Sequence, residues 1–485
     1  MVGEEEHALD AAVVRRAVRK IDRFLLPFMM IGYGITFYDK AILGSAALFG
    51  MTTDLSLIIP DATSSTTTPP ALDSSRLSWA TSIFYLGMVA GLYPMSFGFQ
   101  RFDVGRLLGV VVVFWSGICM LTAAVTTYQQ LYAQRFFLGF VESIIPVGLI
   151  SLTSTFYTQS EQASRAAWWW TAPGFFVVIG GGLNYGFSNV RGGGLHPWQY
   201  IYLLAGVITF VFGLFCFMAP SSPVSARFLS QEEQFAAVER LRHGQTGVRC
   251  TKFKMAQVKE AVLDPKLWLL FIMMASCYTM NGAIIGFGPL IVNTFGWNTL
   301  ESILLQWPVT GFALIAIMVV GVLGSRFPGI RIFMLMANCC VTMTGCAIVW
   351  KSEWTHHAAA PLIGYGLTGC YSGTSVLIVT LASSNVAGNT KKSFTSATIF
   401  VANCVGNIIG PLLVRSQTKT QHYPELWIAL IVSQMVCMAA AAVLYLVLYR
   451  ANRHKSGLLQ NETERAKLAF QDLTDIQNPY FRYVL

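Results

Sequence analysis

Long apolar segments are the feature that most restricts what this chain can fold into. Roughly twelve of them have about the 20 residues that a helix needs to cross a hydrocarbon core of about 30 Å. Only 12% of the residues are charged, against about a quarter in a soluble domain, so too few polar groups are present to cover a globular surface. The sequence therefore predicts an all-α membrane protein with twelve transmembrane helices. The expected spans are 24–50, 75–99, 106–125, 131–157, 165–188, 198–219, 265–293, 302–324, 331–350, 358–382, 394–414 and 427–449.

A polar interval in the middle of the chain divides these spans into two groups of six. The links Arg101–Arg106 and Arg326–Arg331 each place basic residues five positions apart, at matching points of the two groups. Together these features indicate two related six-helix bundles, the arrangement that lets a transporter rock around a central site. We expect a cytoplasmic N-terminal segment (1–23), an N-terminal bundle (24–219), a cytoplasmic central loop (220–264), a C-terminal bundle (265–450) and a cytoplasmic tail (451–485).

The central loop contains one clear helix signal. Ser230-Gln-Glu-Glu233 has the capping-box pattern that opens a helix. Phe235, Val238 and Leu241 would then form one apolar stripe. We expect this helix to lie on the cytoplasmic membrane surface and to act as a tether between the halves rather than as a regulatory element.

Basic residues indicate the orientation, because loops that remain in the cytoplasm are enriched in Lys and Arg. With the N-terminus in the cytoplasm, that side holds most of the basic residues. The opposite side keeps about five, among them Arg76, Arg191, Lys351 and Lys419. Both termini are therefore predicted to be cytoplasmic, with the plasma membrane as the expected location. Residues 1–10 are acidic and polar, unlike a secretory signal peptide, so the first apolar segment should remain as a span.

Several functional classes are excluded by composition and spacing. The net charge of +9 is dispersed over short links, whereas nucleic-acid binding requires a concentrated basic surface. The ten cysteines include no CxxC pair, so we expect no disulfide framework, no metal site and no cofactor. No nucleophile–base cluster is evident, which argues against an enzyme. The expected partners are a small solute, protons and the lipid bilayer, with a monomer as the functional unit.

Charged residues inside the predicted spans point to a functional site, because each costs about 2.5–3.5 kcal/mol at membrane depth. The first span carries Asp39 and Lys40, which point about 100° apart on a helix and can serve different partners. The fourth carries Arg135 and Glu142 on one face, about 10.5 Å apart. Functionally, Arg135 or Lys40 would bind a substrate carboxylate, and Glu142 and Asp39 would carry protons. The alternative is a set of ion pairs that holds the first bundle together.

Polar residues in the second half are less specific. Tyr278, Asn281, Asn403 and Asn407 fall in apolar segments, as does Gln306. Asn403 and Asn407 are four residues apart and share a helix face. Amides at such positions either join neighbouring helices by hydrogen bonds or contribute to a substrate site. Both interpretations stay open for Tyr278, Asn281, Asn403 and Asn407, which we include among the candidate substrate-binding residues.

Motifs along nearly the whole chain resemble the major facilitator superfamily, and specifically the fungal allantoate-permease branch of its anion:cation symporter family. The motifs that carry this resemblance are Arg19-Lys-Ile-Asp22, Asp39-Lys40, Arg135-Phe-Phe-Leu-Gly-Phe-Val-Glu142, Trp198-Gln-Tyr-Ile-Tyr202, Asp264-Pro-Lys-Leu-Trp268, Asn385-Val-Ala-Gly-Asn-Thr-Lys391, Asn403-Cys-Val-Gly-Asn-Ile-Ile-Gly-Pro411 and a tail running from Asp472-Leu-Thr-Asp to Asn478-Pro-Tyr-Phe-Arg-Tyr483.

The resemblance implies the major facilitator fold and proton-driven uptake of small carboxylates such as allantoate, ureidosuccinate, nicotinate, pantothenate or short peptides. It also implies protonation and substrate-binding roles for Asp39, Lys40, Arg135 and Glu142. Two departures from the family pattern are present. Lys40 stands where relatives usually carry Arg, which keeps the charge but loses the bidentate fork. In the link after the second span, the acid of the family signature is displaced by one position, to Asp103.

The hypothesis from the sequence is a proton-coupled symporter that imports a small organic anion by alternating access. Protons would bind at Glu142 and Asp39. One alternative is an efflux transporter that exchanges protons for a metabolite or drug. Another is a nutrient sensor that binds a solute without moving it. The candidate substrate-binding residues are Arg135, Lys40, Asn403, Asn407, Tyr278 and Asn281.

Overall fold

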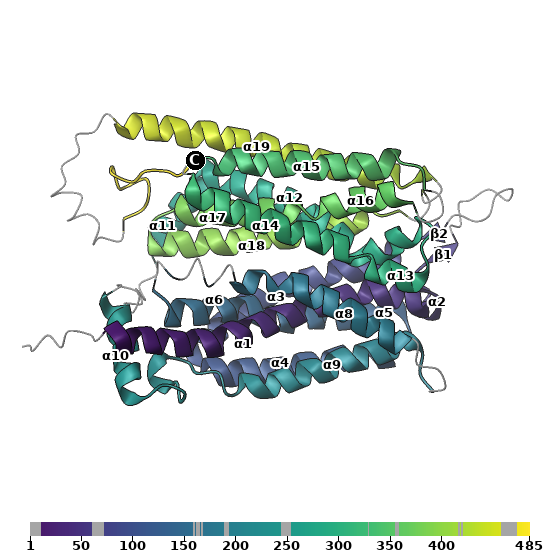
Figure 1. The fold of residues 1–485 in the computed structure, drawn as a ribbon, viewed down its shortest axis with the longest axis horizontal. Coiled ribbons are helices and arrows are strands. Elements are labelled where there is room, and N and C mark those ends of the chain that lie inside the picture. The colour runs from purple at the N-terminus through teal and green to yellow at the C-terminus, as the bar shows by residue number, and fades with distance from the viewer. Residues whose placement is uncertain are drawn as a thin grey trace, which may run out of the picture.

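The fold is almost entirely helical, with two six-helix bundles side by side (Figure 1). The computed structural model describes residues 11–60, 72–158, 161, 165, 168–188, 194–243, 254–327, 329–354, 358–415, 418, 421–456 and 473–485. Arg191, Lys419 and Asp472, named above, lie outside these residues. A two-residue antiparallel ladder, β1 (Ile59–Pro60) with β2 (Leu72–Asp73), forms the strand pairing of the described chain.

The N-terminal bundle is built from α1, α3, α4, α5, α6, α8 and α9. The bounds are α1 Ala11–Ala46, α3 Ser75–Arg101, α4 Val104–Leu121, α5 Tyr128–Glu142, α6 Ile144–Phe156, α8 Ala172–Ser188 and α9 Pro197–Cys216. A π-helical turn, Ala47–Met51, and the short α2, Thr52–Asp54, follow α1, and a 3₁₀ turn, Thr122–Ala124, follows α4. The helix α1 begins well before residue 24, where the first span was predicted to start, because its basic first turns are also helical.

The C-terminal bundle also has six spans. Its helices are α12 Pro265–Asn293, α13 Thr299–Leu304, α14 Trp307–Arg326, α15 Arg331–Lys351, α16 Ala359–Thr368, α17 Tyr371–Ser384, α18 Asn389–Leu412 and α19 Pro424–Ser456. Asp264 caps α12 by accepting the Lys266 N–H (3.1 Å), and Pro265 occupies the first helical position, where no N–H is needed. Three spans are broken into two helices: α5 with α6, α13 with α14, and α16 with α17.

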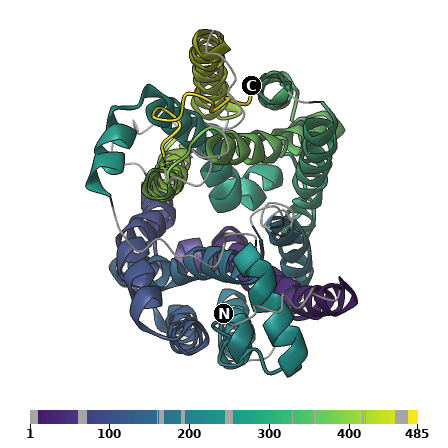
Figure 2. The same cartoon turned by 90° about the vertical axis from the view of Figure 1, so that its left-hand side faces the viewer.

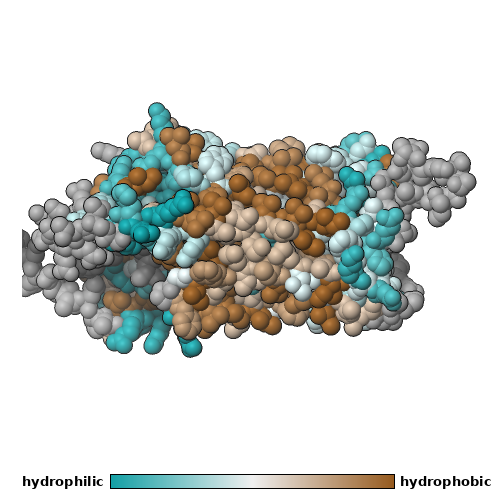
Figure 3. Space-filling view, turned by 90° about the horizontal axis from the view of Figure 1, so that it is seen from above, coloured by the Kyte–Doolittle hydropathy of each residue, from teal (hydrophilic) through white to brown (hydrophobic). Residues whose placement is uncertain are grey.

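Ten helical segments of the described chain are long and apolar enough to cross a membrane. The other two spans are α1, which carries Asp39 and Lys40, and α8, which has only 17 residues. The face seen in the space-filling view has an apolar band across its middle and more polar ends (Figure 3). The predicted all-α membrane architecture with twelve spans in two bundles is therefore confirmed.

The two ends of the molecule differ. The start of α1 and the last residues of the chain lie at the same end of the molecule. The helices α10 (Gln231–His243) and α11 (Met255–Leu263) lie at that end too (Figures 1 and 2). The strands and α13 lie at the opposite end (Figure 1). Near that opposite end the bundles are joined by hydrogen bonds from Ser74 Oγ to the Val414 carbonyl (3.1 Å) and from Ser82 Oγ to the Ile408 carbonyl (2.9 Å).

The central-loop helix α10 packs against α1, and its capping box is present. Ser230 N–H donates to Glu233 Oε2 (2.9 Å), and the Glu233 N–H donates to Ser230 Oγ (3.3 Å). Glu233 also pairs with Lys20 at 2.7 Å. Phe235 and Val238 are exposed while Leu241 is buried, so these three side chains do not share one environment as the stripe predicted.

The C-terminal segment folds back onto the end of its own bundle. Asp475 is fully buried and pairs with Lys266 and with Lys391, the latter at 2.8 Å. The backbone of Val484 exchanges two hydrogen bonds with the Asn385 side chain (2.7 and 2.9 Å). Asn452 on α19 bonds the Tyr483 backbone in the same reciprocal way (2.8 and 2.9 Å). Residues far apart in sequence are thus tied together at this end.

Candidate functional site

Asp39 and Lys40, adjacent on α1, point to different neighbours. The Asp39 carboxylate is buried and accepts hydrogen bonds from Trp115 Nε1 (2.9 Å) and from Cys119 Sγ (3.4 Å), both on α4. Lys40 Nζ lies 2.9 Å from Glu142 Oε1 at the end of α5. The angular offset of neighbouring helical residues accounts for this division. Asp39 is thereby held against α4, whereas Lys40 is directed toward Glu142 on α5.

Arg135 and Glu142 lie on the buried face of α5. Gly139 stands between them, and a Cβ there would collide with the Phe84 carbonyl, so glycine allows α3 and α5 to approach closely. The Arg135 guanidinium donates to the Tyr202 hydroxyl on α9, and its centre lies 5.6 Å from the Tyr202 ring centroid. Arg135 therefore faces α9 rather than the second bundle in this conformation.

The Lys40–Glu142 pair has few other polar contacts. Glu142 is fully buried, and its two carboxylate oxygens receive no hydrogen bond from a neutral donor of the described chain. Lys40 keeps 11% of its side chain exposed and lies 4.8 Å from the Phe37 ring centroid. A buried carboxylate with one partner depends almost wholly on that partner for its charge compensation.

A chain of amide hydrogen bonds faces this pair from the C-terminal bundle. The Tyr371 hydroxyl donates to Asn281 Oδ1, and Asn281 Nδ2 donates to Asn407 Oδ1 (2.7 Å). Asn407 Nδ2 in turn donates to Asn403 Oδ1 (3.0 Å). Because Asn281 is on α12 and Asn407 on α18, these bonds join two helices, and Gly410 lets the helix backbones approach each other closely.

Two cavities lie between the bundles and share a wall. The smaller, of about 30 Å³, is lined by Lys40 together with Tyr278, Asn281, Asn403 and Asn407. These five predicted substrate-binding residues, although far apart in sequence, are thus brought together around one space. Asp39, Arg135 and Glu142 do not line either cavity. Glu142 is instead connected to the smaller one through Lys40.

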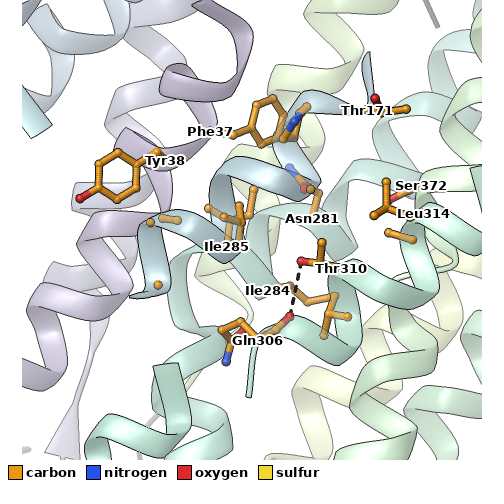
Figure 4. Close-up of a pocket in the computed structure, with 18 of the residues that line it drawn as sticks. Phe37, Tyr38, Thr171, Asn281, Ile284, Ile285, Gln306, Thr310, Leu314 and Ser372 are labelled. Atoms are coloured by element: carbon orange, nitrogen blue, oxygen red, sulfur yellow. Dashed lines mark hydrogen bonds between the residues drawn. The ribbon is translucent and has the colours of Figure 1, made fainter. Parts of the chain in front are cut away.

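The larger cavity has a volume of about 150 Å³ and lies between α1 and α8 on one side and α12, α14 and α17 on the other (Figure 4). It shares four lining residues with the smaller cavity: Tyr33, Phe37, Tyr278 and Asn281. Its polar wall also contains residues that were not among the predicted site residues, namely Tyr38, Asn184, Gln306 and Tyr371. The available signal for Asn184 and Gln306 was a lone amide in an apolar segment, which is also common in simple helix packing.

The displaced acid of the family signature has a definite partner. Asp103 caps α4 by accepting the Arg106 N–H (3.1 Å) and also accepts a hydrogen bond from the Ser221 hydroxyl, beyond the end of α9. The Ser221 hydrogen bond holds the pKa of the Asp103 carboxyl below its usual value. The link between α3 and α4 is thereby attached to the segment that follows α9.

The helices, the apolar band and the central cavities define a polytopic membrane transporter, and comparisons identify its family. The family model described as Major Facilitator Superfamily matches residues 29–411. An uncharacterized transporter of Schizosaccharomyces pombe is 32% identical over all of this chain and 90% of its own length. The allantoate permease of Saccharomyces cerevisiae is 28% identical over 96% of this chain and 86% of its own length. The chain belongs to the major facilitator superfamily.

A solved structure agrees with this assignment at the level of the fold. The proton:xylose symporter XylE bound to 6-bromo-6-deoxy-D-glucose superposes with a TM-score of 0.65 at 12% identity, covering 90% of this chain and 96% of that chain. The predicted family and the prediction of a transporter rather than an enzyme are therefore confirmed. The fungal relatives agree with the allantoate-permease branch that the motifs indicated.

Proposed function

We propose that the protein imports a small organic anion together with a proton by alternating access between the two bundles. The observation that carries the proposal is the position of Lys40. Lys40 lines the smaller cavity, and its ammonium group is the close partner of the buried Glu142 carboxylate. One cation therefore faces both the space for a substrate and the group that would hold the proton.

Competition for Lys40 supplies the coupling. A substrate carboxylate bound at Lys40 draws the ammonium group away from Glu142, which then lacks a charge partner. Breaking a buried ion pair costs about 3–5 kcal/mol. Protonating an ordinary glutamate at pH 7 costs about 3.7 kcal/mol. Because the two costs are similar, Glu142 can take up a proton when the anion binds and release it when the anion leaves.

The membrane potential favours an anion that enters together with a proton over an anion that enters alone. Each charge that crosses contributes about 2.3 kcal/mol per 100 mV. A monoanion moving alone into a negative interior would be opposed by that amount, whereas an anion that moves with one proton is electrically neutral. Asp39, held by Trp115 and Cys119, is the second acid that we assign to proton handling.

Arg135 is assigned to substrate binding only in a conformation that differs from this one. In the present structure its guanidinium donates to Tyr202, and Arg135 lines neither of the two cavities described above. Lys40 is the cation that the cavity presents, with Tyr278, Asn281, Asn403 and Asn407 across from it. We propose that these residues receive the anion first.

The relatives and the basic-residue pattern support the rest of the proposal. One relative is named allantoate permease, which is consistent with a carboxylate substrate. Both ends of the described chain lie at the α10–α11 end (Figure 2), as the predicted cytoplasmic termini require. We propose the plasma membrane as the location. A single chain encloses both cavities, so a monomer suffices for transport.

Gradient-driven uptake tests this function. Purified protein in liposomes would be supplied with radiolabelled allantoate, nicotinate, pantothenate, ureidosuccinate or a dipeptide under an inward proton gradient. The proposal predicts solute accumulation in the direction of proton flow. Movement of solute against the proton flow would instead identify an antiporter. Binding of a solute without any flux would identify a sensor.

A substitution locates the proton site. Glu142→Gln removes the proton-binding group but keeps the size of the side chain, so accumulation driven by the gradient should be lost while exchange of internal for external solute continues. The matched control is Glu425→Gln, at an exposed glutamate paired with Arg415. Unchanged uphill uptake in Glu142→Gln would remove Glu142 from the mechanism.

A further inference from the structure

The lining of the two cavities restricts which organic anion the site can hold, an inference that rests on the proposed function. Lys40 is the one charged side chain that lines either cavity in the described part of the chain. Carboxamides, hydroxyls and the Trp170 indole provide the other polar side-chain groups. We propose that the substrate is a small monocarboxylate whose remaining part is neutral, planar and rich in hydrogen-bond donors and acceptors, as in a ureide or an amide.

The charge of the lining disfavours two other kinds of acid. A dicarboxylate would bring a second negative charge into a space where the described residues offer no second cation. The ammonium group of a zwitterion would find no carboxylate among the described residues that line the two cavities. An ionic group that leaves water without a partner is strongly penalised. Lys40 can compensate one carboxylate, so the rest of the molecule must be uncharged.

Three carboxamides give the larger cavity its preference for a ureide or amide. Asn184 accepts from the Tyr38 hydroxyl (3.0 Å) and donates to Ser45 Oγ (3.1 Å). Gln306 accepts from the Tyr365 hydroxyl (2.8 Å) and donates to the Ser302 carbonyl (3.0 Å).

Asn281 is likewise engaged once as donor and once as acceptor. A carboxamide has two N–H donors and two acceptor positions. Each of the three therefore keeps one donor and one acceptor beyond the hydrogen bonds that it makes within the described chain. Because a ureide or amide group has the complementary N–H and C=O, it can pair with them where an alkyl chain cannot.

Aromatic rings define the shape of the space. The Tyr33 ring centroid lies 5.2 Å from that of Phe37 and 5.8 Å from that of Trp170, and all three residues line the larger cavity. Such a wall favours a planar group over a bulky one. A cavity of about 150 Å³ is comparable to one that holds benzene, so the neutral part of the substrate is limited to a few heavy atoms.

Three chemically matched compounds test the inference. β-Alanine is a zwitterion, N-carbamoyl-β-alanine is the corresponding ureido monocarboxylate, and ureidosuccinate adds a second carboxylate to the same ureide. Binding to the purified full-length protein can be measured at fixed pH from the ligand-dependent rise in its unfolding temperature. We expect N-carbamoyl-β-alanine to bind at least tenfold more tightly than the other two. Equal or tighter binding of either ionic relative would overturn the inference. So would a lack of binding, at millimolar concentration, by both N-carbamoyl-β-alanine and allantoate.

Two cavity variants and one control locate the preference. Gln306→Leu and Asn184→Leu each remove one amide of the cavity, so the affinity for N-carbamoyl-β-alanine should fall about three- to tenfold. The affinity for nicotinate, which has no ureide, should change less. Gln434→Leu is the matched control, because Gln434 is a buried amide on α19 that lines neither cavity. Equal losses for both ligands in the cavity variants, or the same selective loss in the control, would contradict the assignment.

Binding and coupling can fail separately in these experiments. The unfolding measurement uses no proton gradient, so it reports only which anion fits. If N-carbamoyl-β-alanine binds selectively but an imposed gradient does not drive its uptake, the proposed function fails and the substrate class stands. If gradient-driven uptake occurs equally well for the zwitterion or the dicarboxylate, the substrate class fails and the proposed function stands.

Discussion

Two buried lysine–carboxylate clusters lie in different parts of the molecule and are built differently. In the N-terminal bundle, Lys40 pairs with Glu142 at 2.9 Å, and Glu142 receives no further hydrogen bond from a neutral donor of the described chain. At the α11 end of the C-terminal bundle, Lys391 lies within 3.0 Å of three carboxylates. Those carboxylates belong to Glu260, Asp264 and Asp475.

The acids of the two clusters show the same contrast. Asp475 pairs with Lys266 and Lys391 and also accepts from the Tyr483 hydroxyl (3.0 Å). Glu142 depends on one lysine that also lines a cavity. Both acids are fully buried, so burial alone does not distinguish them. The two acids differ in their number of partners and in whether a cavity lies beside their lysine. In the Lys40–Glu142 cluster a ligand can replace Glu142 as the partner of Lys40. The Lys391 cluster instead holds the C-terminal segment in place.

The largest effect is expected from removing the lysine of the first cluster. Lys40→Gln takes away the cation that would receive the substrate, so the rate of uptake at low substrate concentration should fall by about 100-fold or more, as expected for loss of a buried charge pair. Lys40→Arg, which keeps the charge, should retain part of the activity. Initial rates in liposomes provide the measurement. Near-normal uptake by Lys40→Gln would show that Lys40 does not receive the substrate.

Removing an acid of the second cluster should affect stability rather than coupling. Asp475→Asn leaves Lys266 and Lys391 with less compensation, and breaking a buried pair costs about 3–5 kcal/mol. The loss is expected toward the lower end, because Asp264 still neighbours both lysines. Thermal unfolding in detergent should show the loss, while the ratio of gradient-driven to exchange uptake stays as in the unmodified protein. A selective loss of proton drive would show that this cluster also takes part in coupling.

The ion pairs of Asp475 also predict how the contact of residues 473–485 with the C-terminal bundle depends on pH. Burial by itself raises the pKa of Asp475, but Lys266 and Lys391 outweigh it and hold that pKa below the ordinary value of 3.8. An acid with a lowered pKa contributes stability that is present above its unfolded value and is lost as the pH falls through its folded value. Hydrogen exchange of residues 473–485 should therefore be protected from pH 5 to pH 8 by about the same factor. Loss of protection within that range would contradict the assignment.

The smallest effect is expected at the link between α3 and α4. The Ser221 hydroxyl donates to Asp103, which is exposed and also caps α4. Ser221→Ala removes that hydrogen bond, and exposed interactions of this kind contribute at most about 1 kcal/mol. Uptake should change by no more than a few-fold, with the substrate preference unchanged. A change in uptake as large as that for Lys40→Gln would show that the displaced acid controls the conformational change.

Hydropathy and charge predicted much of this molecule because both act locally. The spans follow from apolar length, and Asp39, Lys40, Arg135 and Glu142 were conspicuous because charge is costly at membrane depth. The sequence could not show that Lys40 faces a cavity while Arg135 faces Tyr202, because that depends on which neighbouring helix each residue meets.

Contacts between distant segments were the part that sequence patterns missed. Nothing local to Asp475 indicates that it is buried against Lys266 and Lys391, more than 80 residues away in the chain. Asn184 and Gln306 have the same pattern as amides that only join helices, so their position on a cavity wall depends on the packing of the two bundles.

The most direct test measures proton and solute movement together. Liposomes that contain a pH-sensitive dye would receive radiolabelled substrate at zero membrane potential, with the unmodified protein or with Glu142→Gln. We predict that the unmodified protein acidifies the interior by one proton for each anion that enters, and that Glu142→Gln exchanges solute without acidification. Equal acidification by both proteins would contradict the claim that the cation shared by Glu142 and the cavity couples proton binding to anion binding.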